Sequence, residues 1–266
     1  MLRSRNVLRP LALAAATLGV TASVALAATI TGTNGPDTLI GTSVADSIDA
    51  QSGNDLVLGL GGADAINAGQ GDDTVYGDGS CPAGAADADY CSTDERAGDG
   101  GDSIHGADGD DALYGLGGAD NITGDNDDDR VDGGAGADNL SGGDGTDRMI
   151  GGAGADNITG DNDNDTIYGD AATGEAATDG ADAISGGDGN DTIYGRGGND
   201  SISSANGNDV IDPGSGRDTV TAGDGNDTIS AKDGEKDVID CGANGADKVT
   251  ADRNLDVITN CETITY

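Results

Sequence analysis

The sequence contains no tryptophan and no phenylalanine, and it has a single histidine. Globular domains usually bury aromatic and large aliphatic side chains together, so this shortage excludes an ordinary core. A single histidine, His105, also leaves most acid–base catalytic schemes without a candidate group. No Ser/His/Asp, Cys/His or zinc-ligand combination is present. The sequence therefore predicts a protein that is not an enzyme.

Basic residues are also scarce, because 12 Lys and Arg face 50 Asp and Glu, for a formal net charge of −38. Nucleic acids and anionic membranes repel such a chain, so we expect neither nucleic-acid binding nor membrane insertion. High net charge with low hydropathy is typical of disordered chains. A folded state of this chain therefore requires cations that neutralise the carboxylates.

Glycine, in contrast, is abundant, with 49 residues, and it recurs with a period of nine. Residues 133–159 read GGAGADNLS, GGDGTDRMI and GGAGADNIT, and the same pattern returns as GGDGNDTIY at 186–194 and AGDGNDTIS at 222–230. The repeat is G-G-x-G-x-D-x-U-x, where U is a large aliphatic residue. A fixed short period indicates a repeat architecture and one elongated domain.

The last three positions of each repeat carry residues that favour β-strands. The preceding Gly-rich hexapeptide is turn material, because glycine adopts positive φ at no steric cost. Turns and three-residue strands alternate, and two nonapeptides close one coil. We therefore predict an all-β fold, a parallel β-roll (β-solenoid) of two facing parallel sheets. The U side chains point inward, and positions 7 and 9 face solvent.

Residues 1–27 differ from the rest. Arg3, Arg5 and Arg9 precede an apolar stretch over 11–24, and residues 25–27 form a small-x-small cleavage site. This order predicts a secretory signal peptide. A transmembrane anchor is the alternative, but the apolar run is short for one. We expect a secreted, extracellular mature protein.

The β-roll is predicted over residues 28–266. The period breaks at 77–96 and 169–176, each time after a Tyr-Gly-Asp triplet, and both breaks are predicted to be loops. Beyond residue 232 the repeats lengthen by one residue and lose glycine. Because terminal repeats usually close a stack, we predict a C-terminal cap at about 232–266.

Four cysteines in an exported protein favour two disulfides, although free thiols and other connectivities stay open. We favour Cys81–Cys91 and Cys241–Cys261. The second pair is separated by about two repeats, which is one coil. Strands one coil apart lie about 4.8 Å apart, a spacing that suits a disulfide.

The repeat places an aspartate at position 6, beside the main-chain carbonyls of the Gly-rich turn. Calcium takes six to eight oxygen ligands in flexible geometry. Stacked turns bring an aspartate of one coil beside carbonyls of the next, so we expect a row of Ca²⁺ ions between turns. Their binding would contribute to folding. Magnesium is the weaker candidate, since it requires tighter octahedral geometry.

Over about residues 32–259, these motifs resemble the RTX, or haemolysin-type, calcium-binding nonapeptide repeat. The resemblance implies a parallel β-roll in which position-6 aspartates and turn carbonyls bind Ca²⁺. The candidate metal ligands are Asp37, Asp55, Asp64, Asp73, Asp102, Asp111, Asp120, Asp129, Asp138, Asp147, Asp156, Asp165, Asp182, Asp191, Asp200, Asp209, Asp218 and Asp227.

Some repeats depart from the pattern at position 4, where Val44, Asp127, Asp163 and Asn254 replace glycine. Asp and Asn adopt the left-handed conformation more readily than valine does. The repeat that contains Val44 therefore fits least well, and its aspartate, Asp46, is not among the candidates.

Other motifs are weaker. Residues 161–165 are similar to the start of an EF-hand loop, but Thr166 stands where glycine is required and the terminal Glu is absent. His105 is expected on the surface. Four tyrosines at position 9 fall on alternate repeats and are expected on one sheet face: Tyr76, Tyr114, Tyr168 and Tyr194. They form either a sugar- or surface-binding stripe or ordinary packing at strand edges.

The leading hypothesis is a secreted, non-enzymatic calcium-binding protein that folds on binding Ca²⁺. The alternative is an adhesin or extracellular matrix component. Such a protein would use the roll as a spacer or as a face that binds cell-surface glycans.

Overall fold

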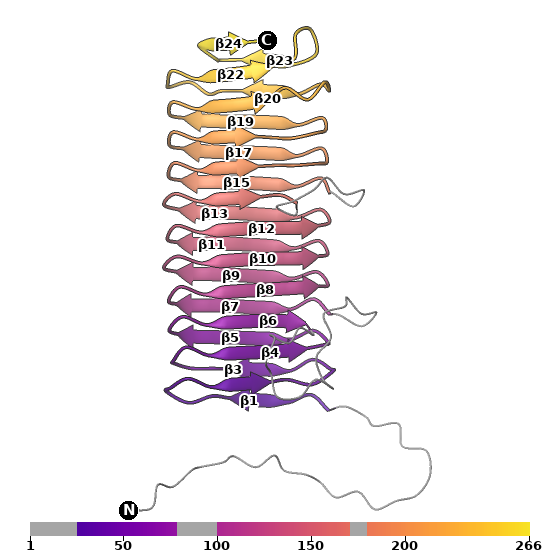
Figure 1. The fold of residues 1–266 in the computed structure, drawn as a ribbon, viewed down its shortest axis with the longest axis vertical. Helices are drawn as coiled ribbons and strands as arrows, with labels where there is room; N and C mark the ends of the chain where they lie inside the picture. Colours follow the sequence, from indigo (N-terminus) through magenta and orange to yellow (C-terminus); the bar gives the residue numbers. More distant parts are fainter. Residues whose placement is uncertain (1–25, 79–99, 171–179) are drawn as a thin grey trace, which may run out of the picture.

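The structure is a computed structural model that describes residues 26–78, 100–170 and 180–266. Its 24 strands form two parallel sheets of 12 strands each, one of odd-numbered and one of even-numbered strands. The chain alternates between the sheets and climbs as a flattened coil (Figure 1). The predicted all-β parallel β-roll is therefore confirmed. Within the described residues, no helix has the length and apolarity needed to cross a membrane. Most of the predicted signal peptide lies outside these residues.

The odd sheet contains β1 (Thr29–Thr31), β3 (Ser47–Asp49), β5 (Ala65–Gln70), β7 (Ser103–Asp108), β9 (Asn121–Asn126), β11 (Asn139–Asp144), β13 (Asn157–Asn162), β15 (Ala183–Asp188), β17 (Ser201–Asn206), β19 (Thr219–Asp224), β21 (Val238–Asp240) and β23 (Val257–Thr259). The even sheet contains β2 (Thr38–Ile40), β4 (Leu56–Leu60), β6 (Thr74–Asp78), β8 (Ala112–Gly117), β10 (Arg130–Ala135), β12 (Arg148–Ala153), β14 (Thr166–Tyr168), β16 (Thr192–Tyr194), β18 (Val210–Asp212), β20 (Thr228–Ala231), β22 (Lys248–Ala251) and β24 (Thr263–Thr265).

The strand register confirms that two nonapeptides make one coil. Leu140 pairs with Ile158 and Asn139 with Asn157, so equivalent repeat positions stack directly on one another. The strands are longer than predicted. Many contain six residues rather than three, because pairing resumes after position 1 and continues into the turn, as in Gly143 with Asp161. Identical turns stacked in register can hydrogen-bond like strands. The prediction of three-residue strands is therefore confirmed for strands such as β14 and β18 and wrong for the longer ones.

Both interruptions of the period lie in turns that lead from the even to the odd sheet, at the right-hand edge in Figure 1. The ladder partners there are 38 and 26 residues apart instead of 18, so 20 and 8 residues are added. Gly77 and Asp78, the first residues of the predicted loop 77–96, lie in or at the end of β6. The remainder of that loop, and residues 171–176 of the second, lie outside the described residues.

The core is one layer of aliphatic side chains between the sheets, supplied by the U positions as predicted. The buried U residues are Leu39, Ile48, Val57, Ile66, Val75, Ile104, Leu113, Ile122, Val131, Leu140, Met149, Ile158, Ile167, Ile184, Ile193, Ile202, Ile211, Val220, Ile229, Ile239 and Val249. Their neighbours at positions 7 and 9 mostly point outward, as the exposed–buried–exposed pattern of β18 shows.

The predicted disulfide Cys241–Cys261 is present, with a Cα–Cα distance of 5.2 Å. It joins residues that follow β21 and β23, which are neighbours one coil apart. The other predicted pair, Cys81–Cys91, lies outside the described residues. In the predicted cap, β21 to β24 continue both sheets, although the spacing between paired residues changes, for example to 19 residues for Thr219 and Val238.

The strand β18 offers a direct test of the core. Ile211 is fully buried, whereas the adjacent Val210 is 47% exposed. In saturating Ca²⁺ we expect Ile211→Ala to lower the free energy of unfolding by about 2–4 kcal/mol, through lost burial and a residual cavity. Val210→Ala should change it by less than about 0.5 kcal/mol. Urea denaturation measures both values, and equal losses would contradict the inward assignment of the U positions.

Candidate metal centre

The position-6 aspartates form two continuous ladders, one along each edge of the roll. The main-chain N–H of each aspartate donates to Oδ1 of the aspartate one coil further on, as from Asp138 to Asp156 and from Asp147 to Asp165, both at 2.8 Å. One ladder comprises Asp37, Asp55, Asp73, Asp111, Asp129, Asp147, Asp165, Asp191, Asp209, Asp227, Asp247 and Glu262. The other comprises Asp46, Asp64, Asp102, Asp120, Asp138, Asp156, Asp182, Asp200, Asp218, Asp237 and Asp256.

The second carboxylate oxygen of most of these aspartates is buried and has no hydrogen-bond donor. Asp138 and Asp147 are each only 1% exposed, so water does not replace the missing donor. The oxygens in this state are Oδ2 of Asp55, Asp64, Asp73, Asp111, Asp129, Asp138, Asp147, Asp156, Asp165, Asp191, Asp200, Asp209, Asp218, Asp227 and Asp237. Burying an unpaired charged oxygen is strongly unfavourable, so each position requires a compensating positive group.

Where position 1 is glycine, this oxygen points toward that glycine of its own repeat, as for Asp64, Asp111, Asp129, Asp138, Asp147, Asp156, Asp165, Asp191 and Asp200. In the repeats of Asp55, Asp73, Asp209, Asp218 and Asp227, position 1 is instead Ala50, Ala68, Ser204, Pro213 and Ala222. A Cβ placed on Gly133 would lie 2.5 Å from Asp138 Oδ2 and 2.7 Å from the carbonyl oxygen of Gly151, which is one coil further on. The space that the missing Cβ leaves is thus bordered by two acceptors. Such a cradle suits a hard cation that takes oxygen ligands, and these residues fit calcium.

No three His, Cys, Asp or Glu side chains converge on a common point in the described part of the chain. The cradle differs from side-chain clusters of that kind, because main-chain carbonyls stand beside a single carboxylate. This arrangement agrees with the expected ligand set of position-6 aspartates and turn carbonyls.

Left-handed backbone at positions 2 and 4 shapes the turns. Gly143 and Gly145 have φ of 119° and 138°. Non-glycine residues at equivalent positions adopt the same conformation, including Asp125 at 82° and Asp127 at 74°. Asp163 and Asn254 do so as well, whereas Val44 is not among the residues with positive φ. The sequence-based distinction between Val44 and the Asp or Asn substitutions is confirmed.

Comparison with known families agrees with this geometry. The RTX calcium-binding nonapeptide repeat matches residues 31–66, 52–80, 96–122, 105–140, 114–149, 141–173, 177–211 and 212–235, which is more than half of the chain. The chain belongs to the RTX calcium-binding repeat family. No curated protein sequence gives a significant match.

In three RTX turns, the Oδ2 oxygen of the aspartate accepts a hydrogen bond from within its own turn. At position 2 of these turns, the residue lacks positive φ and its N–H donates to Oδ2 of the aspartate in the same turn. The pairs are Thr33–Asp37 (2.6 Å), Thr42–Asp46 (2.5 Å) and Asp252–Asp256 (2.6 Å). Asp37 was a candidate ligand, but protein donors already satisfy the oxygen that elsewhere faces the cradle. The other candidates lie in the ladders with open turns or at the two interrupted turns.

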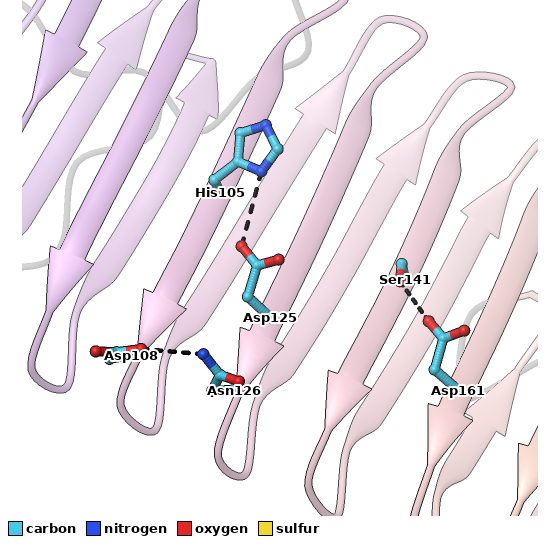
Figure 2. A network of polar contacts seen from close by, with 6 residues as sticks. All are labelled: His105, Asp108, Asp125, Asn126, Ser141 and Asp161. Atoms are coloured by element: carbon cyan, nitrogen blue, oxygen red, sulfur yellow. Dashed lines mark hydrogen bonds and ion pairs between the residues drawn. The ribbon is translucent and has the colours of Figure 1, made fainter.

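Several carboxylates on the outer face of the RTX roll have polar partners. Figure 2 shows three examples on the odd sheet: the hydrogen bonds Asn126–Asp108 (3.0 Å) and Ser141–Asp161 (2.5 Å), and the ion-pair contact His105–Asp125 (3.8 Å). His105 is exposed, as predicted. The missing donors are therefore a property of the buried position-6 carboxylates and not of the acidic composition in general.

Burial raises the pKa of many ladder carboxyls above the ordinary value of 3.8. The pKa rises to about 8 for Asp129, Asp165 and Asp200, and to about 6 for Asp138 and Asp147. Desolvation is the largest cause. The hydrogen bond from the preceding ladder N–H acts in the opposite direction, and for Asp129, Asp165, Asp200 and Asp138 the negative charge of that preceding residue raises the pKa further.

Sequence reasoning missed two buried aspartates at position 2, Asp78 and Asp170, which stand where the two insertions begin. Asp170 accepts hydrogen bonds from Gly180 N at the far end of its insertion and from Gly197 N in the next coil, each at 3.2 Å. These contacts tie the two ends of the insertion together. The repeated Tyr-Gly-Asp triplet was the available signal.

Glu262 was also missed. It takes the place of an aspartate at the end of one ladder, where its Oε2 accepts the Asp247 N–H at 2.9 Å. An acid directly before the strand sequence Thr-Ile-Thr was the signal in this case.

Two aspartates of one turn allow the effect of a buried ladder carboxylate to be compared with that of a surface carboxylate. Asp147 is buried in the ladder, whereas Asp144 of the same turn is exposed. We expect Asp147→Asn to destabilise the calcium-loaded protein by about 2.7 kcal/mol at a calcium concentration of about 100 times Kd, since one bound ion is lost. Asp144→Asn should leave stability nearly unchanged. Thermal or urea unfolding in calcium checks this, and equal effects of the two variants would contradict the assignment.

The raised pKa values predict the pH dependence of the metal-free chain. The folded state holds these protons more tightly than the unfolded chain, so their contribution to stability is complete below pH 3.8 and disappears as pH rises through about 6 to 8. In excess chelator, β-structure should increase on acidification from pH 8 to pH 4. Calcium must displace the same protons, so its folding midpoint should rise as pH falls. Circular dichroism measures both, and a metal-free chain more structured at pH 8 than at pH 4 would oppose the assignment.

Proposed function

We propose that this RTX-family chain is a secreted, non-enzymatic protein that folds when Ca²⁺ binds between its stacked turns. One observation carries the proposal. The two ladders bury unpaired carboxylate oxygens beside main-chain carbonyls, as at Asp138 and Gly151, and only a cation satisfies both. The ion would supply positive charge and a link between successive coils.

The ligands favour calcium over magnesium. Each open turn offers main-chain carbonyls and one position-6 carboxylate, and its φ at position 2 differs between turns, for example 82° at Asp125 and 119° at Gly143. Calcium accepts such variable oxygen geometry, whereas magnesium requires near-ideal octahedral coordination and releases its water reluctantly. An affinity of about 10⁻⁴–10⁻³ M would suit extracellular calcium.

Folding should be cooperative along the roll. Each coil contacts mainly its neighbours, and the U side chains form a core only one layer thick. With a formal charge of −38, the chain also repels itself unless ions are bound. Every ion that joins two coils lowers the free energy needed to order the next coil. The basic and apolar N-terminal segment supports export to a compartment that contains calcium.

The test is a calcium titration of residues 28–266 followed by far-UV circular dichroism. We expect a sharp transition from coil to β-structure in Ca²⁺ and little change at the same concentration of Mg²⁺. A full β signal in excess chelator at pH 7.5 would refute folding on calcium. Equal transitions in the two ions would refute the choice of metal.

The adhesin or matrix alternative retains one supporting observation. Four tyrosines, Tyr76, Tyr114, Tyr168 and Tyr194, lie on the even sheet, as their spacing predicted. They form two stacked pairs with centroid distances of 4.9 and 5.0 Å. This stacking also agrees with a purely structural role of the tyrosines. A role as a binding face, rather than as a spacer, therefore requires a defined ligand site on the roll.

A further inference from the structure

The outward face of the even sheet carries the same series of side chains twice. Tyr168 stacks on Tyr194 with an interplanar angle of 11°, and Asp212 follows Tyr194 in register on the next strand. The earlier series has Tyr76 stacked on Tyr114, followed by Asp132. Each series thus consists of two tyrosines and an aspartate at position 9 of consecutive even strands.

The two series differ at the next strand. In the first, Ile150 follows Asp132 and is only 6% exposed, so an aliphatic side chain fills the column. In the second, Ser230 occupies the corresponding place on β20 and is exposed. The small serine leaves a hollow on the open side of Tyr194. The hollow is lined by Tyr194, Arg196, Asp212, Ser215, Ser230 and Lys232, together with neighbouring turn residues.

Two charged groups at this hollow, Arg196 and Asp233, have defined contacts. The Arg196 guanidinium lies 5.1 Å from the ring centroid of Tyr194 and 5.3 Å from that of Tyr168, so it fixes the stacked pair from the turn side. Asp233, which also borders the hollow, accepts N–H groups from Gly216 at 3.1 Å and Glu235 at 2.8 Å. The site therefore combines one aromatic face with carboxylate, hydroxyl and ammonium groups.

We propose that this hollow binds a neutral saccharide through one pyranose ring. A pyranose with equatorial hydroxyls has an apolar C–H face that packs on a tyrosine ring, while its hydroxyls both donate and accept hydrogen bonds. Asp212 and Ser230 accept, and Lys232 and Ser230 donate. The acidic roll repels polyanions, which favours a neutral sugar over a uronate. The site requires the folded roll but uses no ladder carboxylate.

The test uses saturation-transfer NMR on the calcium-loaded protein, with cellotetraose as the neutral probe and tri-galacturonate as the anionic one. Without tryptophan or phenylalanine, saturation of aromatic protons starts from tyrosine and one histidine. We expect transfer to cellotetraose and much less to tri-galacturonate. Absence of transfer to cellotetraose, or preference for the uronate, overturns the proposal.

Variants locate the site. Ser230→Ile fills the hollow as Ile150 fills the first series, and Asp212→Ala removes an acceptor. Each should raise the Kd for cellotetraose at least ~10-fold. The matched controls are Thr250→Ile, one strand further along the same column, and Asp132→Ala in the filled series, and both should leave the Kd unchanged.

Circular dichroism of every variant in calcium shows whether the variant still folds, and so distinguishes loss of fold from loss of sugar binding. The calcium proposal is tested separately, by the β signal of the unchanged protein with and without calcium. An unchanged Kd in Ser230→Ile with an intact β signal overturns the proposal. Should Asp212→Ala lose its β signal, Ser230→Ile alone decides, since it adds a side chain at an exposed position and removes no contact.

Discussion

The hydrogen bond from each position-6 aspartate N–H to the carboxylate of the next coil determines the rest of this structure. It holds one carboxylate oxygen against the preceding coil, and the other lies beside position 1 of its own repeat. In Asp138, that second oxygen shares the space beside Gly133 with a carbonyl of the following coil. Repetition of this unit along both edges creates the fold and also its requirement for cations.

The ladders explain how the roll accepts insertions. Twenty residues enter one turn and eight enter another, yet Asp64 still bonds to Asp102 at 2.7 Å and Asp156 to Asp182 at 2.9 Å. Both insertions follow position 2 of a repeat. After each insertion the repeat continues at position 4, with Gly100 or Gly180, so that Asp102 and Asp182 keep their places in the ladder. The strands and the aliphatic layer on both sides of each insertion are therefore unaffected.

Much of the architecture could be predicted from the sequence because the period fixes it. The Asp, Gly and U positions gave the coil length, the inward residues and most of the ladder, as Leu140 against Ile158 shows. Local exceptions could not be predicted, since they depend on contacts across a coil. Thr33 and Thr42 close their own turns, and Asp170 joins the ends of an insertion. The hollow beside Tyr194 depends on Ser230, which lies two strands away on β20.

Near neutral pH, the ladder hydrogen bonds should form only when bound cations neutralise the buried carboxylates, since most of these carboxyls are then not protonated. Residue-resolved hydrogen exchange of the position-6 amides, from Asp46 to Asp237, tests this most directly. We predict slow exchange of both ladders in saturating Ca²⁺, and exchange at the rate of an unstructured chain along the whole array in excess chelator at pH 7.5. Ladder amides that stay protected in chelator would contradict the account, because the roll would then be stable with its carboxylates unpaired.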